Sequence, residues 1–245
     1  MDRIRLQPLV GLGDGSVFGY EALYRKGDAA EYPSAHHILQ SIFSNAGECS
    51  TLGRRDFRLF INMTPKDLED DSFCHHLFRV MDENGINGRN IVLEVSENTS
   101  PEAIGQVKKT LNLLRRRRIR IALDDFGTKY SGMDFMSELP VDIVKIDKKF
   151  VQSAPSSKKA RTLLKFMSQV SHDIGCRVVA EGIETLQQLE CVKESNIDVG
   201  QGFLFTTVPS APDQKTSIFI GLREFPSFIS QKIGPRMMGV LPSLS

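Results

Sequence analysis

Short apolar segments alternate with longer amphipathic segments along most of the chain. The short segments are rich in Val, Ile, Leu and Phe, which is typical of buried strands, and the longer ones repeat their apolar positions at the helical period. This alternation indicates βα units around a parallel sheet, and about seven or eight units fit the chain. The expected strands are 59–63, 91–95, 119–123, 143–146, 177–180 and 202–205.

Two apolar segments near the N-terminus break this alternation. Residues 5–12 and 17–24 are separated only by Gly13-Asp14-Gly15-Ser16, a composition typical of a tight turn. We therefore expect a hairpin, and with it one strand that runs against the others. The predicted fold class is α/β, a TIM-like (β/α)8 barrel with one antiparallel strand near the N-terminus.

Two of the helices are predicted from their own start signals and periodicity. Ser100 can cap a helix over 100–117, in which Pro101 suits the first helical position. A second helix is expected over 157–174, with apolar residues spaced for one buried face. Those residues are Leu163, Leu164, Met167, Val170 and Ile174.

The length and composition favour a single domain. The chain has 245 residues, of which 40% are hydrophobic and 25% charged, and this matches one α/β barrel. No internal repeat and no Pro/Ser-rich linker marks a second domain. We expect one domain over 1–245, with a core barrel over about 5–209 and a C-terminal helix and tail over 210–245.

The charge balance gives no sign of a nucleic-acid or membrane partner. Lys plus Arg number 31 against 30 for Asp plus Glu, so DNA and membranes are not expected partners. The four consecutive arginines at 115–118 fit a solvated helix end better than a nucleic-acid site. The four scattered cysteines and the absence of an apolar leader indicate a reduced, cytoplasmic protein.

Polar residues stand at the end of nearly every expected strand, where the loops that form the working face of a barrel begin. Their spacing of roughly 20 to 40 residues leaves room for a helix and a return strand between them, so we expect them to form a ring. A single acid at a strand end is most often a helix cap or a surface ion pair that contributes little to the free energy of unfolding. Polar residues at seven strand ends together indicate a functional site. In order they are Glu21, Asn62, Glu94, Asp124 with Asp125, Lys145, Glu181 and Gln201.

Such a ring of carboxylates is suited to bound cations. Crowded carboxylates raise one another's pKa, and cations relieve that repulsion. Oxygen ligands without histidine or thiolate favour Mg²⁺ or Mn²⁺. The adjacent pair Asp124-Asp125 could bind two such ions. Taken alone, Asp124-Asp125-Phe126-Gly127 fits a structural turn equally well. Two such ions would activate a phosphodiester, while Lys145 neutralises phosphate charge or positions water. The pairs His36-His37 and His75-His76 are expected to point apart and are left out of the site.

These residues lie in short motifs whose order resembles the EAL family of bacterial cyclic di-GMP phosphodiesterases, from Gln7 to about Pro209. The name-giving signature is Glu21-Ala22-Leu23, followed by Arg25. The further motifs are Ile61-Asn62-Met63-Thr64-Pro65, Glu94-Val95-Ser96-Glu97, Asp124-Asp125-Phe126-Gly127, Lys145-Ile146-Asp147, Ala180-Glu181-Gly182-Ile183-Glu184-Thr185 and Gln201-Gly202-Phe203.

The resemblance implies that cyclic di-GMP is linearised to pGpG with two Mg²⁺ or Mn²⁺ ions, in a chain that forms a homodimer and answers to a regulatory protein partner. It implies catalytic roles for Glu21, Lys145, Glu181 and Asp125. The implied metal ligands are Glu21, Asn62, Glu94, Asp124, Asp125 and Glu181, and the implied substrate contacts are Gln7, Leu23, Arg25 and Gln201. Supporting roles fall to Glu97, Glu184 and Asp147.

The chain departs from the family pattern at a few positions. Lys129 and Gly132 stand in the loop after Asp125 where glycine and serine are common, and Lys26 replaces a frequent tryptophan. The segment between Leu23 and Asn62 is shorter than usual by roughly one helix. Two alternatives therefore stand beside the enzyme: a sensor that binds cyclic di-GMP without cleaving it, and an interaction partner that binds no nucleotide.

Overall fold

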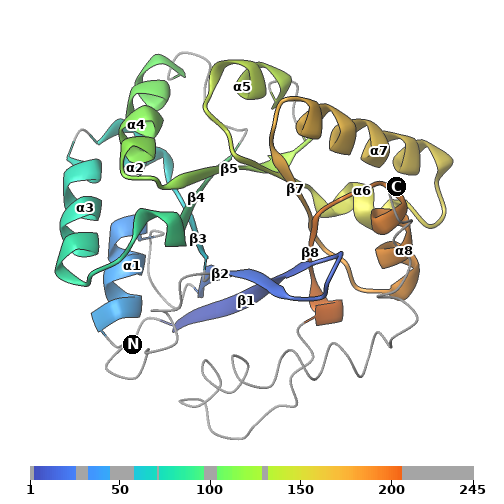
Figure 1. Cartoon of the computed structure of the whole chain (residues 1–245), viewed down its shortest axis with the longest axis horizontal. Coiled ribbons are helices and arrows are strands. Elements are labelled where there is room, and N and C mark those ends of the chain that lie inside the picture. Colours follow the sequence, from blue (N-terminus) through green and yellow to red (C-terminus); the bar gives the residue numbers. More distant parts are fainter. Residues whose placement is uncertain are drawn as a thin grey trace, which may run out of the picture.

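The computed structural model describes residues 3–25, 33–44, 58–70, 72–96, 104–128 and 132–205, and these residues form a closed eight-stranded barrel in the order β1 to β8. The hairpin strand β1 is antiparallel to β2 and to β8, and the other neighbouring strands are parallel. The predicted fold class is thereby confirmed (Figure 1). The strands are β1 (Arg3–Gly11), β2 (Val17–Arg25), β3 (Leu59–Asn62), β4 (Ile91–Ser96), β5 (Arg120–Phe126), β6 (Ile143–Ile146), β7 (Arg177–Ala180) and β8 (Val199–Gln201).

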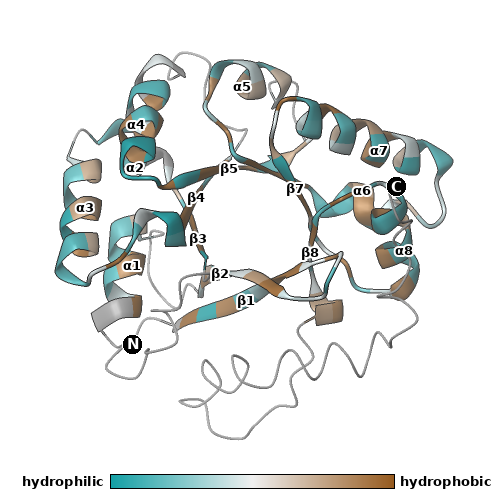
Figure 2. Cartoon of the chain, in the orientation of Figure 1, coloured by the Kyte–Doolittle hydropathy of each residue, from teal (hydrophilic) through white to brown (hydrophobic). Residues whose placement is uncertain are grey.

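The helices form a ring outside the strands, and their apolar sides pack against the barrel (Figures 1 and 2). They are α1 (Ala35–Ser44), α2 (Pro65–Glu69), α3 (Phe73–Glu83), α4 (Ile104–Arg116), α5 (Gly132–Glu138), α6 (Lys148–Ser153), α7 (Lys158–Asp173) and α8 (Leu186–Glu194). Short 3-10 turns cover Gly88–Asn90 and Phe203–Phe205. No helix in the described ranges is both long and apolar enough to cross a membrane.

The predicted position of the last strand is wrong. β8 covers Val199–Gln201, and the apolar run 203–205 forms a 3-10 turn. Gly202 causes the difference, because its φ of 156° and its missing side chain let the chain turn against the backbone of Ile183. A Cβ at Gly202 would lie 2.1 Å from the Ile183 carbonyl oxygen. The turn is therefore set by one contact between distant segments, which periodicity does not reveal.

The predicted helix over 157–174 is confirmed in its start and corrected at its end. Ser157 caps α7 by accepting a hydrogen bond from the Ala160 amide at 3.2 Å. The helix ends at Asp173, and Ile174 is 50% exposed instead of buried. In the other predicted helix, Ser100 and Pro101 lie outside the described residues.

The expectation that neighbouring histidines point apart is also wrong for the first pair. The rings of His36 and His37 lie 4.1 Å apart, because the Ser34 hydroxyl contacts Nδ1 of both, at 3.0 and 2.8 Å. Among the described residues, the one group of side chains that could hold a metal ion contains no histidine.

Eight side chains fill the inside of the barrel, and we call them the apolar plug. Four come from the odd-numbered strands and four from the even-numbered strands, as the layers of a (β/α)8 barrel require. All are buried, and they form a cluster separate from the packing between strands and helices. They are Leu9, Phe60, Ala122 and Val179, and Phe18, Val92, Ile143 and Val199.

A bulge in β2 supplies one member of the plug. Leu9 pairs with Gly19 and Val10 with Val17, so Phe18 is the extra residue of the bulge. Gly19 has no side chain there, since a Cβ would lie 2.8 Å from the carbonyl oxygen of Arg58. The ring of Phe18 therefore occupies the inside of the barrel beside β3.

The plug divides the barrel into two chemically different ends. Side chains two residues apart on a strand point the same way, so the positions two before and two after each plug residue also face inward. On β3 to β8 the residues two positions after the plug are Asn62, Glu94, Asp124, Lys145, Glu181 and Gln201. The predicted polar ring thus lies directly above the plug.

Replacing Phe60 with Ala should test the plug, because it leaves a cavity between both ends of the barrel. We expect the free energy of unfolding to fall by about 3–5 kcal/mol. Urea denaturation followed by circular dichroism measures the change. The matched variant Phe166→Ala removes a ring that is 55% exposed on α7 and should cost about 0.5 kcal/mol or less. Equal costs for the two variants would refute the assignment of the core.

Candidate active site at the carboxyl ends of the strands

The inward-facing polar residues lie in two tiers. Glu21, Glu94, Lys145 and Gln201 come from even-numbered strands and are only 6%, 1%, 1% and 4% exposed. Above them, the side chains of Asn62, Asp124, Asp125 and Glu181 are half-buried. Glu21 is therefore not the surface acid that its place at a strand end suggests, and Glu94 is buried as well.

The Lys145 ammonium lies at the centre of these carboxylates. Its Nζ is 2.6 Å from Glu94 Oε1, 2.7 Å from Glu181 Oε1, 2.9 Å from Asp124 Oδ1 and 3.8 Å from Glu21 Oε2. One positive charge therefore serves four carboxylates, and the cluster keeps an excess of negative charge. We call the carboxylates Glu21, Glu94, Asp124, Asp125 and Glu181 the acidic site.

Two side-chain amides fix the orientation of Glu21. Asn62 Nδ2 donates to Glu21 Oε1 at 3.0 Å, and Gln201 Nε2 donates to Glu21 Oε2 at 2.5 Å. Because β2, β3 and β8 each supply one of these groups, closure of the barrel is what brings them together. The carboxylate of Glu21 is held in one position before any ligand binds.

A bulge in β5 allows two adjacent aspartates to serve the same site. On a regular strand Asp124 and Asp125 would point to opposite faces of the sheet. The register of β5 against β6 shifts between Leu123 and Phe126, and Asp125 adopts a left-handed conformation with φ of 57°. One oxygen from each of Asp124, Asp125 and Glu181 consequently lies within 4.8 Å of the others.

Burial and crowding raise the pKa values of the cluster. Burial raises the pKa of Glu94 well above its ordinary value, and the Glu21 charge adds to the rise. Burial raises the pKa of Glu181 to about 7, although the Lys145 ammonium opposes that rise. For Lys145 itself burial lowers the pKa, but the surrounding carboxylates outweigh this and the pKa lies well above its ordinary value. Lys145 is thus an ammonium ion at neutral pH.

The donor set fits divalent cations. Both oxygens of Glu94 and Oδ1 of Asp124 are buried, and among the described residues no backbone amide or neutral side chain donates to them. The Lys145 ammonium is the group that faces Glu94 Oε1 and Asp124 Oδ1, and it is shared with two further carboxylates. Buried carboxylate oxygens without donors are costly unless a cation takes up their lone pairs. Carboxylate and amide oxygens are ligands that hard ions such as Mg²⁺ and Mn²⁺ accept.

The other predicted site residues are placed as follows. Gln7 on β1 pairs with Glu21 and is half-buried, and the half-buried Leu23 lies two residues after Glu21 on β2. Asp147 caps α6 by accepting from the Lys149 amide at 3.0 Å. Exposed Glu184 accepts from Gln152 at 3.3 Å. These hydrogen bonds of Asp147 and Glu184 do not reach the acidic site, and their supporting roles stay predictions.

Some predictions lie outside the described residues. Glu97, Lys129 and Lys26 are not described, nor are the side chain of Arg25 and the tail over 206–245. The central position of Lys145 among the carboxylates is what sequence reasoning missed, since it assigned the lysine to phosphate charge or to the attacking water. The available signal was its setting, because Val144 and Ile146 flank it in a fully buried strand.

Replacing Lys145 with Met should expose how much the carboxylates depend on this cation. We expect the metal-free protein to lose about 3–5 kcal/mol of unfolding free energy, because buried carboxylates are left without a counter-charge. Added Mg²⁺ should recover part of that loss. Urea denaturation with and without the ion measures both, and Lys165→Met, at an exposed position of α7, is the control. A variant as stable as that control would contradict the central role of Lys145.

Comparison with known proteins agrees with this geometry. The EAL domain family matches residues 2–207. The chain is 30% identical over 217 residues to the probable cyclic di-GMP phosphodiesterase PdeG of Escherichia coli, covering 81% of this chain and 43% of PdeG. It is 26% identical over 225 residues to the cyclic di-GMP phosphodiesterase NbdA of Pseudomonas aeruginosa, covering 83% of this chain and 28% of NbdA. The chain therefore spans less than half the length of these relatives.

Among solved structures, BlrP1 of Klebsiella pneumoniae in a complex with calcium and cyclic di-GMP superposes with a TM-score of 0.73. The two chains are 27% identical, and the match covers 83% of this chain and 55% of BlrP1. Motif order, barrel topology and the family match therefore agree that this chain belongs to the EAL domain family.

Proposed function

We propose that this chain hydrolyses cyclic di-GMP to linear pGpG with two divalent metal ions, Mg²⁺ or Mn²⁺. The observation that carries the proposal is the cluster of carboxylate oxygens that converge on one another and share the single Lys145 ammonium, at the end of the barrel where enzymes of this fold act. The names of NbdA and PdeG as cyclic di-GMP phosphodiesterases and the cyclic di-GMP in the BlrP1 complex support the choice of substrate.

The acidic site and Asn62 would hold the ions. Asp124, Asp125 and Glu181 already bring three oxygens together, and Glu21, Glu94 and Asn62 lie beside them. When bound, the ions supply Lewis-acid polarisation of the phosphodiester and lower the pKa of an attacking water. The amides of Asn62 and Gln201 keep Glu21 oriented throughout.

Lys145 contributes a fixed positive charge in a buried position. An ammonium ion in a low-dielectric site stabilises negative charge that develops on phosphate oxygens in the transition state. Its carboxylate neighbours hold it in place, so little reorganisation is needed when the substrate binds. Gln7, Leu23, Arg25 and Gln201 are the proposed contacts to the nucleotide.

The proposed reaction consumes one water molecule. The water oxygen adds to phosphorus, and the bond from phosphorus to one ribose 3′ oxygen breaks. A water proton goes to a base and the released ribose oxygen takes a proton, so the product is pGpG with a 5′ phosphate. Glu181 lies beside Asp124 and Asp125 at the site, so it is the proposed base.

We further propose a homodimer in the cytoplasm that answers to a regulatory protein partner. The resemblance to the EAL family supports the homodimer and the regulatory partner. The balance of 31 basic against 30 acidic residues gives no sign of a DNA or membrane partner.

The Asp125→Asn variant should test the enzymatic proposal, since it removes one carboxylate and keeps the shape of the bulge. We expect turnover of cyclic di-GMP with Mn²⁺ to fall by about 100-fold or more. Chromatographic detection of pGpG measures it. The control Asp134→Asn makes the same change at an exposed position of α5 and should leave turnover unaltered. Binding of cyclic di-GMP without any turnover by the folded wild-type protein would favour the sensor, and absence of both would favour the interaction partner.

Metal removal should have a readout besides activity. In protein passed over a chelating resin we expect no turnover, and added Mn²⁺ should restore it and raise the melting temperature through preferential binding to the folded state. In Asp124→Asn/Asp125→Asn the rise in melting temperature should be largely lost, whereas Asp134→Asn should keep it. Turnover that persists in chelated protein would refute the metal-dependent mechanism.

A further inference from the structure

A cavity of about 350 Å³ lies at the end of the barrel where the parallel strands begin. Residues at or just before the starts of β3, β5, β6, β7 and β8 line it, and no residue of the acidic site does so. The apolar plug separates the two, because Phe18 and Ile143 belong both to the plug and to the cavity lining. The cavity is therefore distinct from the site proposed for hydrolysis.

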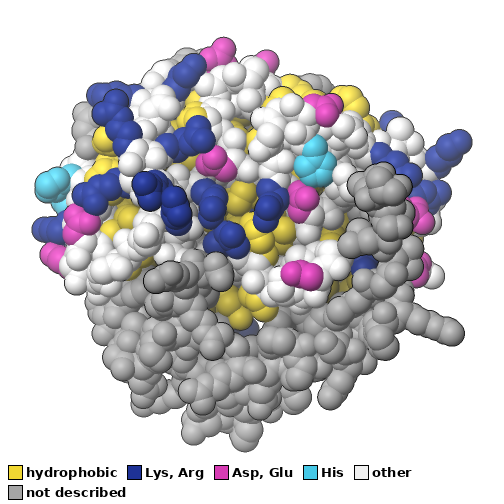
Figure 3. All heavy atoms as spheres, in the orientation of Figure 1, with side chains coloured by type: hydrophobic (Ala, Val, Ile, Leu, Met, Phe, Trp, Pro, Cys, Tyr) yellow, Lys and Arg dark blue, Asp and Glu magenta, His cyan; other side chains and the backbone are white. Residues whose placement is uncertain are grey.

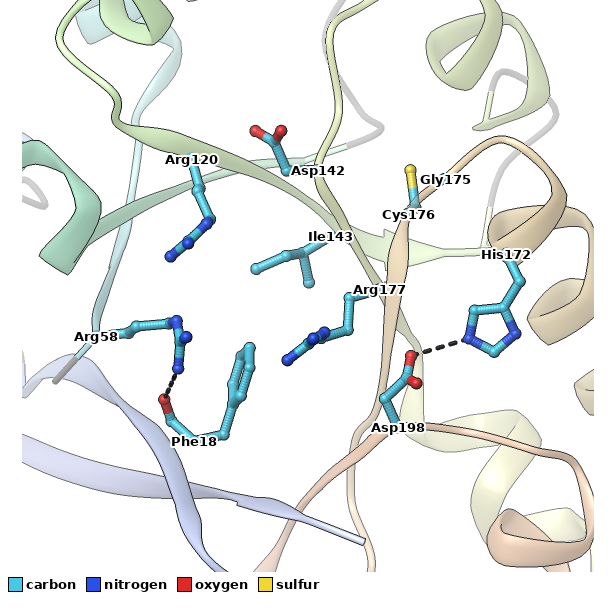
Figure 4. A pocket seen from close by; sticks show the side chains of 10 residues that line it. All are labelled: Phe18, Arg58, Arg120, Asp142, Ile143, His172, Gly175, Cys176, Arg177 and Asp198. Carbon is cyan, nitrogen blue, oxygen red and sulfur yellow. Dashed lines mark hydrogen bonds and ion pairs between the residues drawn. The ribbon is translucent and has the colours of Figure 1, made fainter. Parts of the chain in front are cut away.

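Three arginines from alternate strands lie in one layer at this end. Arg58, Arg120 and Arg177 each stand two residues before a plug residue, on or next to β3, β5 and β7. Alternate strands of such a barrel contribute side chains at the same level, so the three guanidinium groups converge. Figure 4 shows the three side chains directed toward the same central space. We call them the arginine layer.

Basic side chains dominate the surface around the cavity. Figure 3 shows lysine and arginine side chains gathered over the middle of the face drawn, in front of the barrel as oriented in Figure 1. The run Arg115–Arg118 belongs to this end of the molecule, since α4 ends there just before β5 begins. An anion that approaches this face meets a local positive field although the whole chain is nearly neutral.

The carboxylates in the cavity wall are engaged elsewhere. Asp142 forms an ion pair with Arg115 at 3.0 Å and accepts the Ile121 amide at 2.9 Å. Asp198 contacts His172 Nε2 at 2.9 Å and accepts the Val178 amide at 2.7 Å. Asp142 thus binds the start of β5 and Arg115, and Asp198 binds the start of β7 and the His172 ring.

This engagement leaves two members of the arginine layer, Arg120 and Arg177, without a carboxylate partner in the described structure. Within the described part of the chain, no carboxylate lies in ion-pair distance of Arg120 or Arg177. Arg120 Nη1 donates to the Arg89 carbonyl at 3.1 Å, and a backbone carbonyl leaves the guanidinium charge unneutralised.

Phe18 holds two of the three guanidinium groups in place. The Cζ of Arg58 lies 4.4 Å from the centre of the Phe18 ring, and that of Arg177 lies 5.2 Å from it. Arg58 Nη1 also donates to the Phe18 carbonyl at 3.0 Å. These contacts reduce the freedom that long side chains lose on binding, so a ligand meets a partly ordered site.

We propose that the arginine layer and its cavity form a binding site for a phosphate-bearing small molecule. Guanidinium groups offer paired N–H donors that match phosphate oxygens. Three of them converge here, and among the described residues Arg120 and Arg177 have no carboxylate partner. The volume admits free phosphate or a phosphate ester of about mononucleotide size. The ring of Phe18 provides an apolar surface beside the phosphate position.

Titration calorimetry at low ionic strength tests this proposal with three probes: inorganic phosphate, GMP and a short polyglutamate peptide. The protein is freed of metal on a chelating resin, because EDTA is itself a polyanion and free metal would recruit phosphate to the acidic site. We expect saturable binding of phosphate or GMP by the wild-type protein. Tighter binding of GMP than of phosphate would identify a phosphate ester as the ligand, and equal affinity would identify the phosphate group itself.

The double variant Arg120→Ala/Arg177→Ala should bind the same probe about tenfold more weakly or worse. The control Arg79→Ala/Lys165→Ala removes the same charge from exposed positions of α3 and α7 and should bind like the wild type. Arg120→Lys/Arg177→Lys keeps the charge and should recover only part of the affinity, and circular dichroism checks that every variant is folded. Equal affinity in the double variant and its control, or binding of the peptide alone, would overturn the proposal.

Discussion

The ion pairs between Lys145 and the carboxylates around it set the requirements for the rest of the structure. A buried ammonium ion and buried carboxylates are tolerated only together, because either one alone would carry a large desolvation cost. The charges come from five strands, so only a closed barrel assembles them. The excess of carboxylates over ammonium is also what makes the same cluster suitable for divalent cations.

The barrel separates opposite chemistries by simple periodicity. On β3, β5 and β7 the same inward-facing column reads arginine, plug residue, then amide or acid: Arg58, Phe60, Asn62; Arg120, Ala122, Asp124; Arg177, Val179, Glu181. The apolar plug keeps the basic and acidic ends from neutralising each other. A barrel with polar residues throughout would let these groups pair internally, and neither end would retain charge for a ligand.

The strands and the acidic positions could be predicted because both follow from local patterns. Apolar runs of the right length gave the strands 143–146 and 177–180 with correct bounds, and strand ends are where a barrel places its polar residues. The turn at Gly202 and the bulge that aims Asp125 could not be predicted, because each depends on contact with a neighbouring segment. The depth of Glu94 follows from the stagger of the strands, which sequence spacing does not contain. The arginine layer could not be predicted for a similar reason, since its members are far apart in sequence and meet only when the barrel closes.

The reversed direction of β1 has a consequence for how this domain can be joined to others. Arg3 pairs with Arg25 at the far end of β2, so the chain enters the barrel at the end that holds the acidic site and reaches the basic end at Gly11. A sensory module spliced in ahead of Arg3 would thus emerge beside the acidic site. Its movement could be passed to Gln7 along a single strand of the hairpin, without a relay through the outer helices.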